Sequence, residues 1–391
     1  MLAIVTSHPI QYQAPLWRAL AADGRVPFQV WFLTPHALQP TPDKEFGRTF
    51  AWDLDLLSGY PHRFLPVRPD WKLGRFNGVR LQTDWEQELR QHGVTGLWLE
   101  GWRFRTLWQA AAAAHRLGIP VWIRGESHDL APESRLRRLL KRVALGWLFR
   151  RVDNFLCIGS ANRRFYRRHG IPESQLHPAP YCVDNARFAA AALEAAPRRA
   201  AVRQQWGIAE GAYCVLFCGK FIPKKRPLDL VVAVRQVAQS AGRPLHLLFA
   251  GDGELATILR EELARAPAVP ASFTGFLNQT GIPAAFVAAD CLVLPSDYGE
   301  TWGLVVNEAL AAGRPVIVSD HCGCAEDLAA PLGAAHVFPC GDTAALADCL
   351  RTVITRPPAP AALRALSESH SPQRTVESVV AALPARPGAP R

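Results

Sequence analysis

The sequence predicts an α/β protein with two domains, each built around a doubly wound parallel sheet, with a cleft between them. Short apolar runs rich in β-branched and aromatic residues alternate with helix-length segments, which is typical of βαβ units with buried sheets. The chain has 391 residues, more than one ordinary hydrophobic core holds. Proline and alanine are concentrated over residues 184–205, which predicts a linker there.

The predicted strands and helices follow one another in the order that such a fold requires. In the first half we expect strands at residues 2–7, 28–34, 96–101, 120–125 and 154–160, and helices at 15–22 and 105–118. In the second half we expect strands at 213–219, 245–251, 271–276, 291–296 and 315–320, and helices at 227–242 and 254–266. We therefore predict a first domain over residues 1–190, a second over 191–380 and a flexible tail over 381–391.

The composition indicates a folded protein with reduced thiols. Hydrophobic residues make up 49% and charged residues 20%, the balance of a packed globular chain. No segment reaches the roughly 18 uninterrupted apolar residues that a membrane span needs, and the N-terminal run has the form of a strand rather than a signal peptide. The nine cysteines form no two pairs with zinc-site spacing. We therefore expect a cytoplasmic protein without a bound metal.

The surplus of positive over negative charge is confined to the first half of the chain. Residues 1–200 contain 28 Lys and Arg against 17 Asp and Glu, whereas residues 201–391 contain 16 against 17. The net charge of +10 must therefore be explained by what the first half contacts.

A basic loop follows the strand predicted at residues 213–219. The loop GKFIPKKR at 219–226 carries four cations and precedes a predicted helix. Four cations at a helix N-terminus repel one another unless an anion lies among them. A phosphate is the ligand expected there, because free backbone amides and ammonium groups can all bind its oxygens. A solvated basic turn is the structural alternative.

The segment SDYGETWGLVVNEAL at residues 296–310 places two carboxylates around the start of a predicted helix. Glu300 lies in the loop before the helix, and Glu308 lies one to two turns inside it. The first helical turn presents amides that lack intrahelical acceptors. A carboxylate accepts two sugar hydroxyls well because it is acceptor-only, and a buried carboxylate without such partners is costly. The segment therefore predicts a site for a phosphorylated polyhydroxyl ligand, with an ordinary surface helix as the alternative.

Five stretches of the second half occur together in an order that is specific. They are FCGKFIPKKRP, FAGDGEL, FTGF, AADCLVLPSDYGETWGLVVNEALAAGRPVIVSD and GCAEDL. Over residues 211–350 the set resembles the donor-binding domain of family 4 glycosyltransferases. These are retaining, metal-independent enzymes of the GT-B fold, in which two Rossmann-like domains face a central cleft. The resemblance implies a nucleotide-diphosphate sugar as donor and no cofactor.

The resemblance also implies roles for individual residues. Glu308 would bind the ribose of the nucleotide, and Glu300 would hold hydroxyls of the transferred sugar as a catalytic residue. Lys220 and Lys225 would neutralise the diphosphate with the help of backbone amides. The remaining members of the predicted donor site are Trp302, Gly303 and Leu304.

Three positions depart from the commoner family pattern. Lys220 stands where arginine is usual, which keeps the charge but loses the bidentate geometry. Trp302 replaces the usual phenylalanine, and Cys322 stands where a glycine is often found.

Loops after two strands of the first domain supply further candidates. His8, Gln11 and Tyr12 follow the first strand and are available for acceptor hydroxyls. Glu126 and His128 follow the strand at 120–125, and the resemblance implies a catalytic role for His128 near the donor sugar. Polar loop surface is the alternative for each. In the family the donor phosphate itself helps to deprotonate the incoming hydroxyl, with charge stabilisation from the cations.

Residues 133–152 predict a basic amphipathic helix. Leu136, Leu139, Leu140, Val143, Trp147 and Leu148 recur at helical spacing among Arg135, Arg138, Lys141, Arg142, Arg150 and Arg151. Such a helix can lie on an anionic bilayer, where it would reach a lipid-linked acceptor. The alternative is a helix packed on its own sheet with a solvated basic face. Nucleic acid is not expected, because no recognition module accompanies the charge.

Together these features predict a retaining glycosyltransferase that moves a sugar from a nucleotide-diphosphate donor to a hydroxyl of a glycan, lipid-linked or small-molecule acceptor. The C-terminal segment is expected to cross back to the first domain, and residues 274–277 are expected to contact the nucleotide base. Two alternatives stay open: a nucleotide-sugar epimerase of the same fold, and a non-catalytic nucleotide- or carbohydrate-binding protein.

Overall fold

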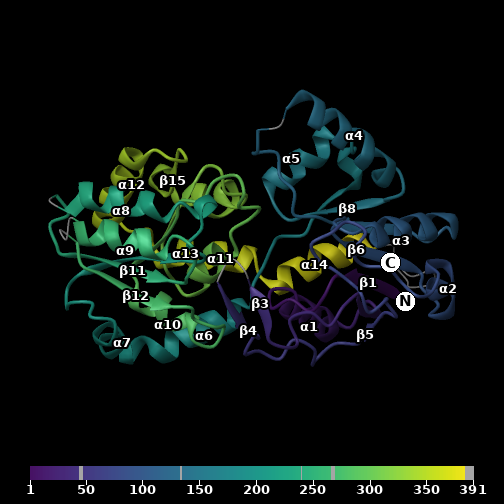
Figure 1. Cartoon of the computed structure of the whole chain (residues 1–391), viewed down its shortest axis with the longest axis horizontal. Coiled ribbons are helices and arrows are strands. Elements are labelled where there is room, and N and C mark those ends of the chain that lie inside the picture. Colours follow the sequence, from purple (N-terminus) through teal and green to yellow (C-terminus); the bar gives the residue numbers. More distant parts are fainter. Residues whose placement is uncertain (44–46, 133, 239, 266–268, 384–391) are drawn as a thin grey trace. The chain divides into compact units, whose positions relative to one another are not determined.

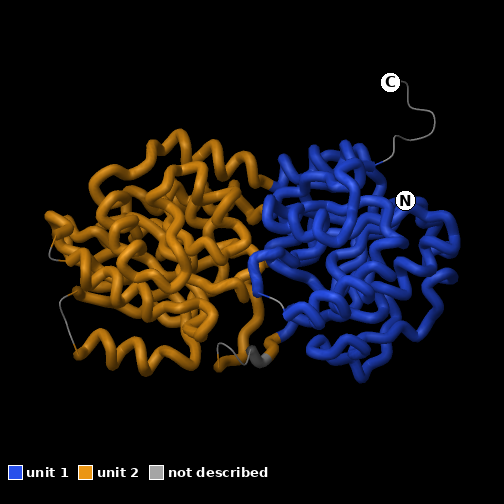
Figure 2. The backbone as a smooth tube through the Cα atoms, turned by 90° about the horizontal axis from the view of Figure 1, so that it is seen from above, with its two compact units in different colours: residues 1–39, 55–181, 372–391 blue, residues 40–54, 182–371 orange. Residues whose placement is uncertain are grey.

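The computed structural model describes residues 1–43, 47–132, 134–238, 240–265 and 269–383. The chain forms two compact units, each with its own parallel sheet and core (Figure 1). The first unit contains residues 1–39, 55–181 and 372–391, and the second contains residues 40–54 and 182–371 (Figure 2).

The first unit is built on a seven-stranded parallel sheet with the order β5-β2-β1-β6-β7-β8-β9. Its strands are β1 (Leu2–Thr6), β2 (Phe28–Phe32), β5 (His62–Phe64), β6 (Gly96–Glu100), β7 (Val121–Arg124), β8 (Asn154–Cys157) and β9 (Leu176–Pro178). Its helices are α1 (Ala14–Asp23), α2 (Trp85–Gln91), α3 (Arg105–Arg116), α4 (Arg135–Phe149), α5 (Ser160–Arg168) and α14 (Pro372–Ala382).

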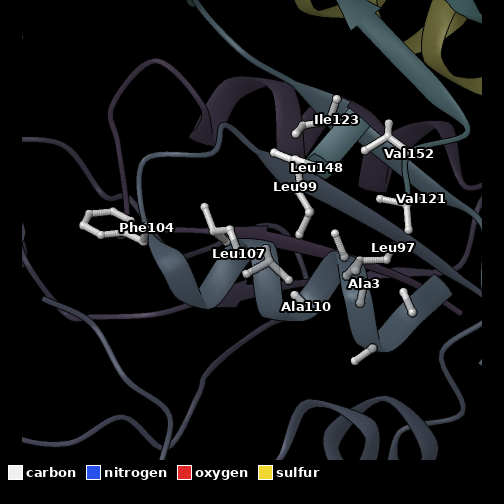
Figure 3. Packing of buried hydrophobic residues seen from close by; sticks show 14 of the residues in the cluster. Ala3, Leu97, Leu99, Phe104, Leu107, Ala110, Val121, Ile123, Leu148 and Val152 are labelled. Atoms are coloured by element: carbon white, nitrogen blue, oxygen red, sulfur yellow. The ribbon is translucent and has the colours of Figure 1, made fainter. Parts of the chain in front are cut away.

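The alanine run of α3 explains how closely this helix packs on the sheet. Ala110, Ala111, Ala113 and Ala114 are all buried in the core of the first unit. Small side chains let a helix approach the apolar face of a sheet without voids. Figure 3 shows this packing, with Leu107 and Ala110 of α3 beside the leucines of β6.

The second unit is built on a six-stranded parallel sheet with the order β12-β11-β10-β13-β14-β15. Its strands are β10 (Tyr213–Cys218), β11 (Leu245–Ala250), β12 (Ala271–Gly275), β13 (Cys291–Leu294), β14 (Val316–Ser319) and β15 (Val337–Phe338). Its helices are α6 (Asn185–Ala195), α7 (Arg199–Gln205), α8 (Pro227–Ala238), α9 (Ala256–Arg265), α10 (Ile282–Ala288), α11 (Leu304–Ala311), α12 (Thr343–Thr355) and α13 (Pro360–Ser369).

Two segments belong to a unit whose other residues are distant from them in sequence. The antiparallel hairpin of β3 (Thr41–Asp43) and β4 (Arg48–Phe50) lies in the second unit. The C-terminal helix α14 lies in the first unit, where the Thr375 hydroxyl donates to the carbonyl oxygen of Pro180 at 2.6 Å. The first domain was expected to contain residues 1–190 without interruption. In the structure, residues 40–54 belong to the second unit, and the main division falls between residues 181 and 182. The predicted tail 381–391 falls largely outside the described residues.

The predicted fold class and all ten predicted strands are confirmed. The predicted linker over residues 184–205 is wrong, because these residues form α6 and α7 within the second unit. Phe188 of α6 is buried there against Phe286, with ring centroids 5.8 Å apart. Alanine is the strongest helix former, so its concentration here indicates helices rather than a connecting segment. Among the described residues, no helix is long and apolar enough to span a membrane.

Candidate functional site

The five family-like stretches meet at one edge of the second sheet. β10, β11, β12, β13 and β14 run parallel, so the loops that follow them leave from the same, carboxyl-terminal edge. This edge is where ligands bind in open α/β sheets.

Backbone hydrogen bonds join the first three loops. The amide of Gly219 donates to the carbonyl oxygen of Ala250 at 2.9 Å, and that of Phe221 donates to Asp252 at 2.8 Å. The amide of Gly251 donates to the carbonyl oxygen of Gly275 at 2.9 Å. A Cβ atom at position 251 would lie 1.9 Å from the Gly219 carbonyl oxygen. Glycine is therefore required where the loops touch.

The other loops are joined in the same way. The amide of Asp297 donates to the carbonyl oxygen of Lys224 at 2.8 Å, which connects the basic loop to the loop of Glu300. The amide of Cys324 donates to the carbonyl oxygen of Trp302 at 3.1 Å. The five stretches thus form one continuous surface.

Lys225 and Glu300 form an ion pair on this surface. Their side chains are 16% and 14% exposed, so both charges are largely removed from water. Burial works against the charge of Lys225, but the Glu300 carboxylate outweighs it and raises the pKa of the ammonium group. The Ser296 hydroxyl also donates to Glu300, at 3.4 Å. The Lys225 ammonium group is therefore held as a cation directly beside the Glu300 carboxyl group.

The N-terminus of α11 opens onto the same surface. Gly303 precedes the helix with a φ of 103°, a left-handed conformation that favours glycine. A Cβ atom there would lie 2.7 Å from Cδ2 of Leu294. Trp302 is buried, and its indole donates to Oδ1 of Asn307 at 2.8 Å. Its side chain thus fixes the start of the helix.

Glu308 and Lys220 complete the predicted donor residues. Glu308 is 1% exposed on α11. Cys218 is the last residue of β10. Burial raises the pKa of its thiol most, and the Glu308 carboxylate raises it further. Glu308 therefore lies close to the end of this central strand. Lys220 is half-buried in the loop that follows.

The hairpin of β3 and β4 lines the segment that was expected to contact the base. The rings of Phe50 and Phe276 lie 4.6 Å apart, and the Arg48 guanidinium lies 4.9 Å from the Phe276 ring. The side-chain amide Nδ2 of Asn278 donates to the carbonyl oxygen of Ala51 at 2.8 Å. Sequence reasoning missed this contribution, since the hairpin comes from the first half of the chain.

The first-unit candidates lie on two loops at the carboxyl edge of the first sheet. His8, Gln11 and Tyr12 lie between β1 and α1. The Nδ1 atom of His8 is 2.8 Å from the Ser7 hydroxyl. Burial, the neighbouring His36 and Arg103 lower the pKa of His8 to about 4, so its ring is neutral at neutral pH. Glu126 accepts a hydrogen bond from the Tyr181 hydroxyl.

His128 follows β7 and borders a cationic cavity in the first unit. Its Nδ1 accepts a hydrogen bond from the amide of Leu130 at 3.1 Å. The cavity, of about 620 Å³, is also lined by Arg138, Lys141, Arg168 and His169. The catalytic role of His128 stays a prediction.

A buried polar network at the start of α1 and the ends of β6 and β7 was not predicted. The side-chain amide Nε2 of Gln13 donates to Oε2 of Glu100 at 3.3 Å, and Arg124 Nη1 lies 3.9 Å from the same oxygen. The Arg124 guanidinium also lies 4.8 Å from the Tyr181 ring. A signal was present in the sequence, because Glu100 and Arg124 are charged residues that end otherwise apolar strands.

Comparison with known proteins gives a family resemblance for part of the second unit. Residues 198–369 match the family model "Glycosyl transferases group 1". This part of the chain is thus similar to the group 1 glycosyl transferases. It is 33% identical over 168 residues to the GDP-mannose-dependent alpha-(1-6)-phosphatidylinositol dimannoside mannosyltransferase of Mycobacterium tuberculosis. That match covers 41% of this chain and 41% of the relative. The 2-deoxystreptamine glucosyltransferase of Streptomyces kanamyceticus is 28% identical over 298 residues, 73% of each protein.

Solved structures confirm that this chain has the GT-B fold. HepE from Anabaena in complex with UDP superposes with a TM-score of 0.71 at 17% identity, over 98% of this chain and all of that one. WaaG, described as a glycosyltransferase involved in lipopolysaccharide biosynthesis, superposes with a TM-score of 0.57 at 16% identity, over 97% of this chain and 95% of that one.

Within the described ranges, no three His, Cys, Asp or Glu side chains are grouped so as to hold a metal ion.

Glu100 is expected to make the stability of this protein depend on pH. Burial raises the pKa of its carboxyl group from 4.5 to about 7. Between these values the folded chain holds a proton that the unfolded chain releases, so stability falls as pH rises through this window. Glu100→Gln mimics the protonated form. Relative to this variant, the wild type should lose about 2–3 kcal/mol of unfolding free energy between about pH 5 and about pH 8.

Urea unfolding of both proteins at the two pH values measures this difference. Glu194→Gln, at an exposed position of α6, is the matched control and should run parallel to the wild type. An equal change in unfolding free energy between the two pH values for the wild type and Glu100→Gln would contradict the prediction.

Proposed function

We propose that this chain is a retaining, metal-independent glycosyltransferase that moves a sugar from a nucleotide-diphosphate donor to an acceptor hydroxyl. The observation that carries the proposal is the convergence of Lys225, Glu300, Glu308 and the N-terminus of α11 on one edge of the second sheet. A donor of this kind combines two phosphates with two sets of hydroxyls, and this edge offers cations, amides and carboxylates together.

Each part of the donor has a chemically matched partner. Lys220, Lys225 and the amides at Gly303 and Leu304 would bind the diphosphate, as helix N-termini and ammonium groups do. Glu300 would accept hydroxyls of the transferred sugar. Glu308 would accept ribose hydroxyls, since an ionised carboxylate is acceptor-only.

The ion pair of Lys225 and Glu300 makes both residues ready for the donor. Without the donor each compensates the charge of the other in a site shielded from water. When the donor binds, the phosphate oxygens would take over Lys225 and the sugar hydroxyls would take over Glu300. Neither charge is then left buried alone, which would cost several kcal/mol.

The transfer itself would use the donor phosphate as the base. The bond between the anomeric carbon and the phosphate oxygen breaks, and a bond to the acceptor oxygen forms on the same face. The hydroxyl proton passes to the departing phosphate, whose charge Lys220 and Lys225 stabilise. We propose His128 as a group close to the sugar and His8, Gln11, Tyr12 and Glu126 as acceptor contacts.

The site chemistry defines the class of acceptor but not the individual molecule. A glycan, a lipid-linked glycan or a small polyhydroxyl molecule would each present the required hydroxyl. We propose that the protein works in the cytoplasm, with peripheral contact between residues 133–152 and an anionic membrane at its inner face.

A thermal-shift screen against UDP, GDP, ADP and their sugar conjugates tests the donor proposal. A ligand at 100 times its dissociation constant should stabilise the protein by about 2.7 kcal/mol. We expect one nucleotide family to raise the melting temperature, and the shift to persist in EDTA. No shift with any of the nucleotides would refute a nucleotide-diphosphate donor from these families, and loss of the shift in EDTA would refute metal independence.

A further inference from the structure

Helix α4 of the first unit carries an apolar stripe on its outer surface. Leu136, Leu139, Leu140, Val143 and Trp147 are between 43% and 67% exposed. They lie at spacings of three, four, seven and eleven residues from Leu136, which places them on one face of the helix. Exposed leucines are ordinary singly, but a contiguous apolar stripe marks an interaction surface.

The opposite face holds α4 on its unit. Leu145, Leu148 and Phe149 are buried in the core. The expectation that α4 packs on its own sheet is thus correct only for this short face near its C-terminus. Leu148, which the sequence grouped with the other apolar residues, belongs to the core and not to the stripe.

Positive charge flanks the stripe. Arg135, Arg137 and Arg142 are exposed, and the sequence of α4 contains no acidic residue. A symmetric contact between two copies of the stripe would bring arginines against arginines. The charge therefore favours an anionic partner over a second copy of this chain.

The stripe continues into a basic groove in the same unit. The Trp147 ring stacks on Trp108 with centroids 5.9 Å apart, and both line a cavity of about 930 Å³. The exposed ring of Phe76 adds to its apolar wall. Four arginines also line it, Arg68, Arg80, Arg105 and Arg116. Two of them are ion-paired, Arg80 with Asp70 at 2.8 Å and Arg116 with Glu86 at 2.6 Å. Among the described lining residues Asp84 is the one carboxylate, and it caps α2.

We propose that α4 lies in the surface of an anionic phospholipid bilayer, with the apolar stripe among the acyl chains and the groove open to a lipid phosphate. An apolar stripe bordered by arginines matches the two layers of such a surface, since acyl chains lie beneath anionic headgroups. This inference rests on the membrane contact of the proposed function and gives it a defined surface. Sugar transfer to an acceptor in water would stand without it.

Vesicle flotation of the full chain tests the stripe. Vesicles of equal parts phosphatidylcholine and phosphatidylglycerol should bind the wild type, and phosphatidylcholine alone should bind it more weakly. Leu140→Ser should weaken binding at least about tenfold, because a buried leucine side chain contributes that much to partition. Leu193→Ser, at an exposed leucine of α6, is the matched control and should bind as the wild type does.

Arg105→Gln tests the groove. It should lower the preference for the anionic vesicles about fivefold, the contribution of one cation near such a surface. Arg356→Gln, at an exposed arginine of the second unit, should leave the preference unchanged. An unchanged preference in Arg105→Gln would overturn the assignment of the groove.

Three results would overturn the proposal. One is no binding to either vesicle, and another is binding that Leu140→Ser leaves intact. The third is an oligomer of the wild type in solution that Leu140→Ser dissociates, which would assign the stripe to contacts between copies. The rise in melting temperature with nucleotide, measured on the Leu140→Ser variant, tests the donor proposal separately. It should equal that of the wild type, because α4 lies outside the unit that contains the proposed donor residues.

Discussion

Glu300→Gln is expected to lower sugar transfer about 100-fold while nucleotide binding is retained or becomes tighter. Hydrogen bonds from the sugar hydroxyls to an ionised carboxylate are the strong ones, and glutamine keeps the shape but loses the charge. The substitution also frees Lys225 from its ion pair, so that the ammonium group is fully available to a diphosphate. Initial rates with the donor found by thermal shift, together with calorimetry of the nucleotide alone, measure both effects.

Asp297→Asn is the matched control for Glu300→Gln. Asp297 lies in the same loop and accepts a hydrogen bond from the amide of Gly299 at 2.7 Å, which asparagine can also accept. This variant should transfer sugar at nearly the wild-type rate. Full activity in Glu300→Gln would remove Glu300 from the transfer step.

Lys225→Ala is expected to weaken nucleotide binding at least about tenfold, because a charge-assisted contact with the diphosphate contributes about 1.5–3 kcal/mol. It should also lower the unfolding free energy by about 3 kcal/mol, since Glu300 is then left largely buried without its partner. Calorimetry and urea unfolding of the same preparation measure the two quantities.

The double variant Lys225→Met with Glu300→Gln separates binding from folding. It removes both charges, so most of the stability should return while nucleotide affinity stays low. Lys224→Ala, at the neighbouring lysine whose carbonyl oxygen accepts from Asp297, is the control and should bind nucleotide more tightly than Lys225→Ala. Wild-type affinity in Lys225→Ala would contradict the assignment of the phosphate site.

The parts of the fold that the sequence predicted are those that local pattern determines. Each apolar run of β1, β6, β7, β10 and β13 is followed by a turn and a helix, and a parallel sheet is the way to bury such runs on both faces. The strands that were missed have two or three residues, such as β5 and β15. These are too short to carry a periodic signal.

The convergence of the proposed donor residues on one sheet edge was predictable for the same reason. Lys225, Glu300 and Glu308 belong to loops and a helix that follow their own strands, and parallel strands bring those loops to one edge. The network of Gln13, Glu100 and Arg124 was not predicted, although two of its members end strands. Its contacts join segments that are remote along the chain, and only the order of strands in the sheet makes them neighbours.

The outward face of α4 shows a different limit of sequence reasoning. A stripe of leucines at helical spacing predicts a helix, but not whether the stripe faces the core. Here the residues that anchor the helix and the residues that stay outside are both apolar. Only the packing of Leu145, Leu148 and Phe149 against the sheet decides which set is which.

The exchange of segments between the units has a consequence for how the protein is made. The chain passes from one unit to the other after residues 39, 54, 181 and 371. The indole of Trp122 donates to the carbonyl oxygen of Ala382 at 3.2 Å, and Val376 and Val379 of α14 are buried. During synthesis on the ribosome, the first unit therefore waits for a helix that emerges after the entire second unit. The half that is translated first is the half that is completed last.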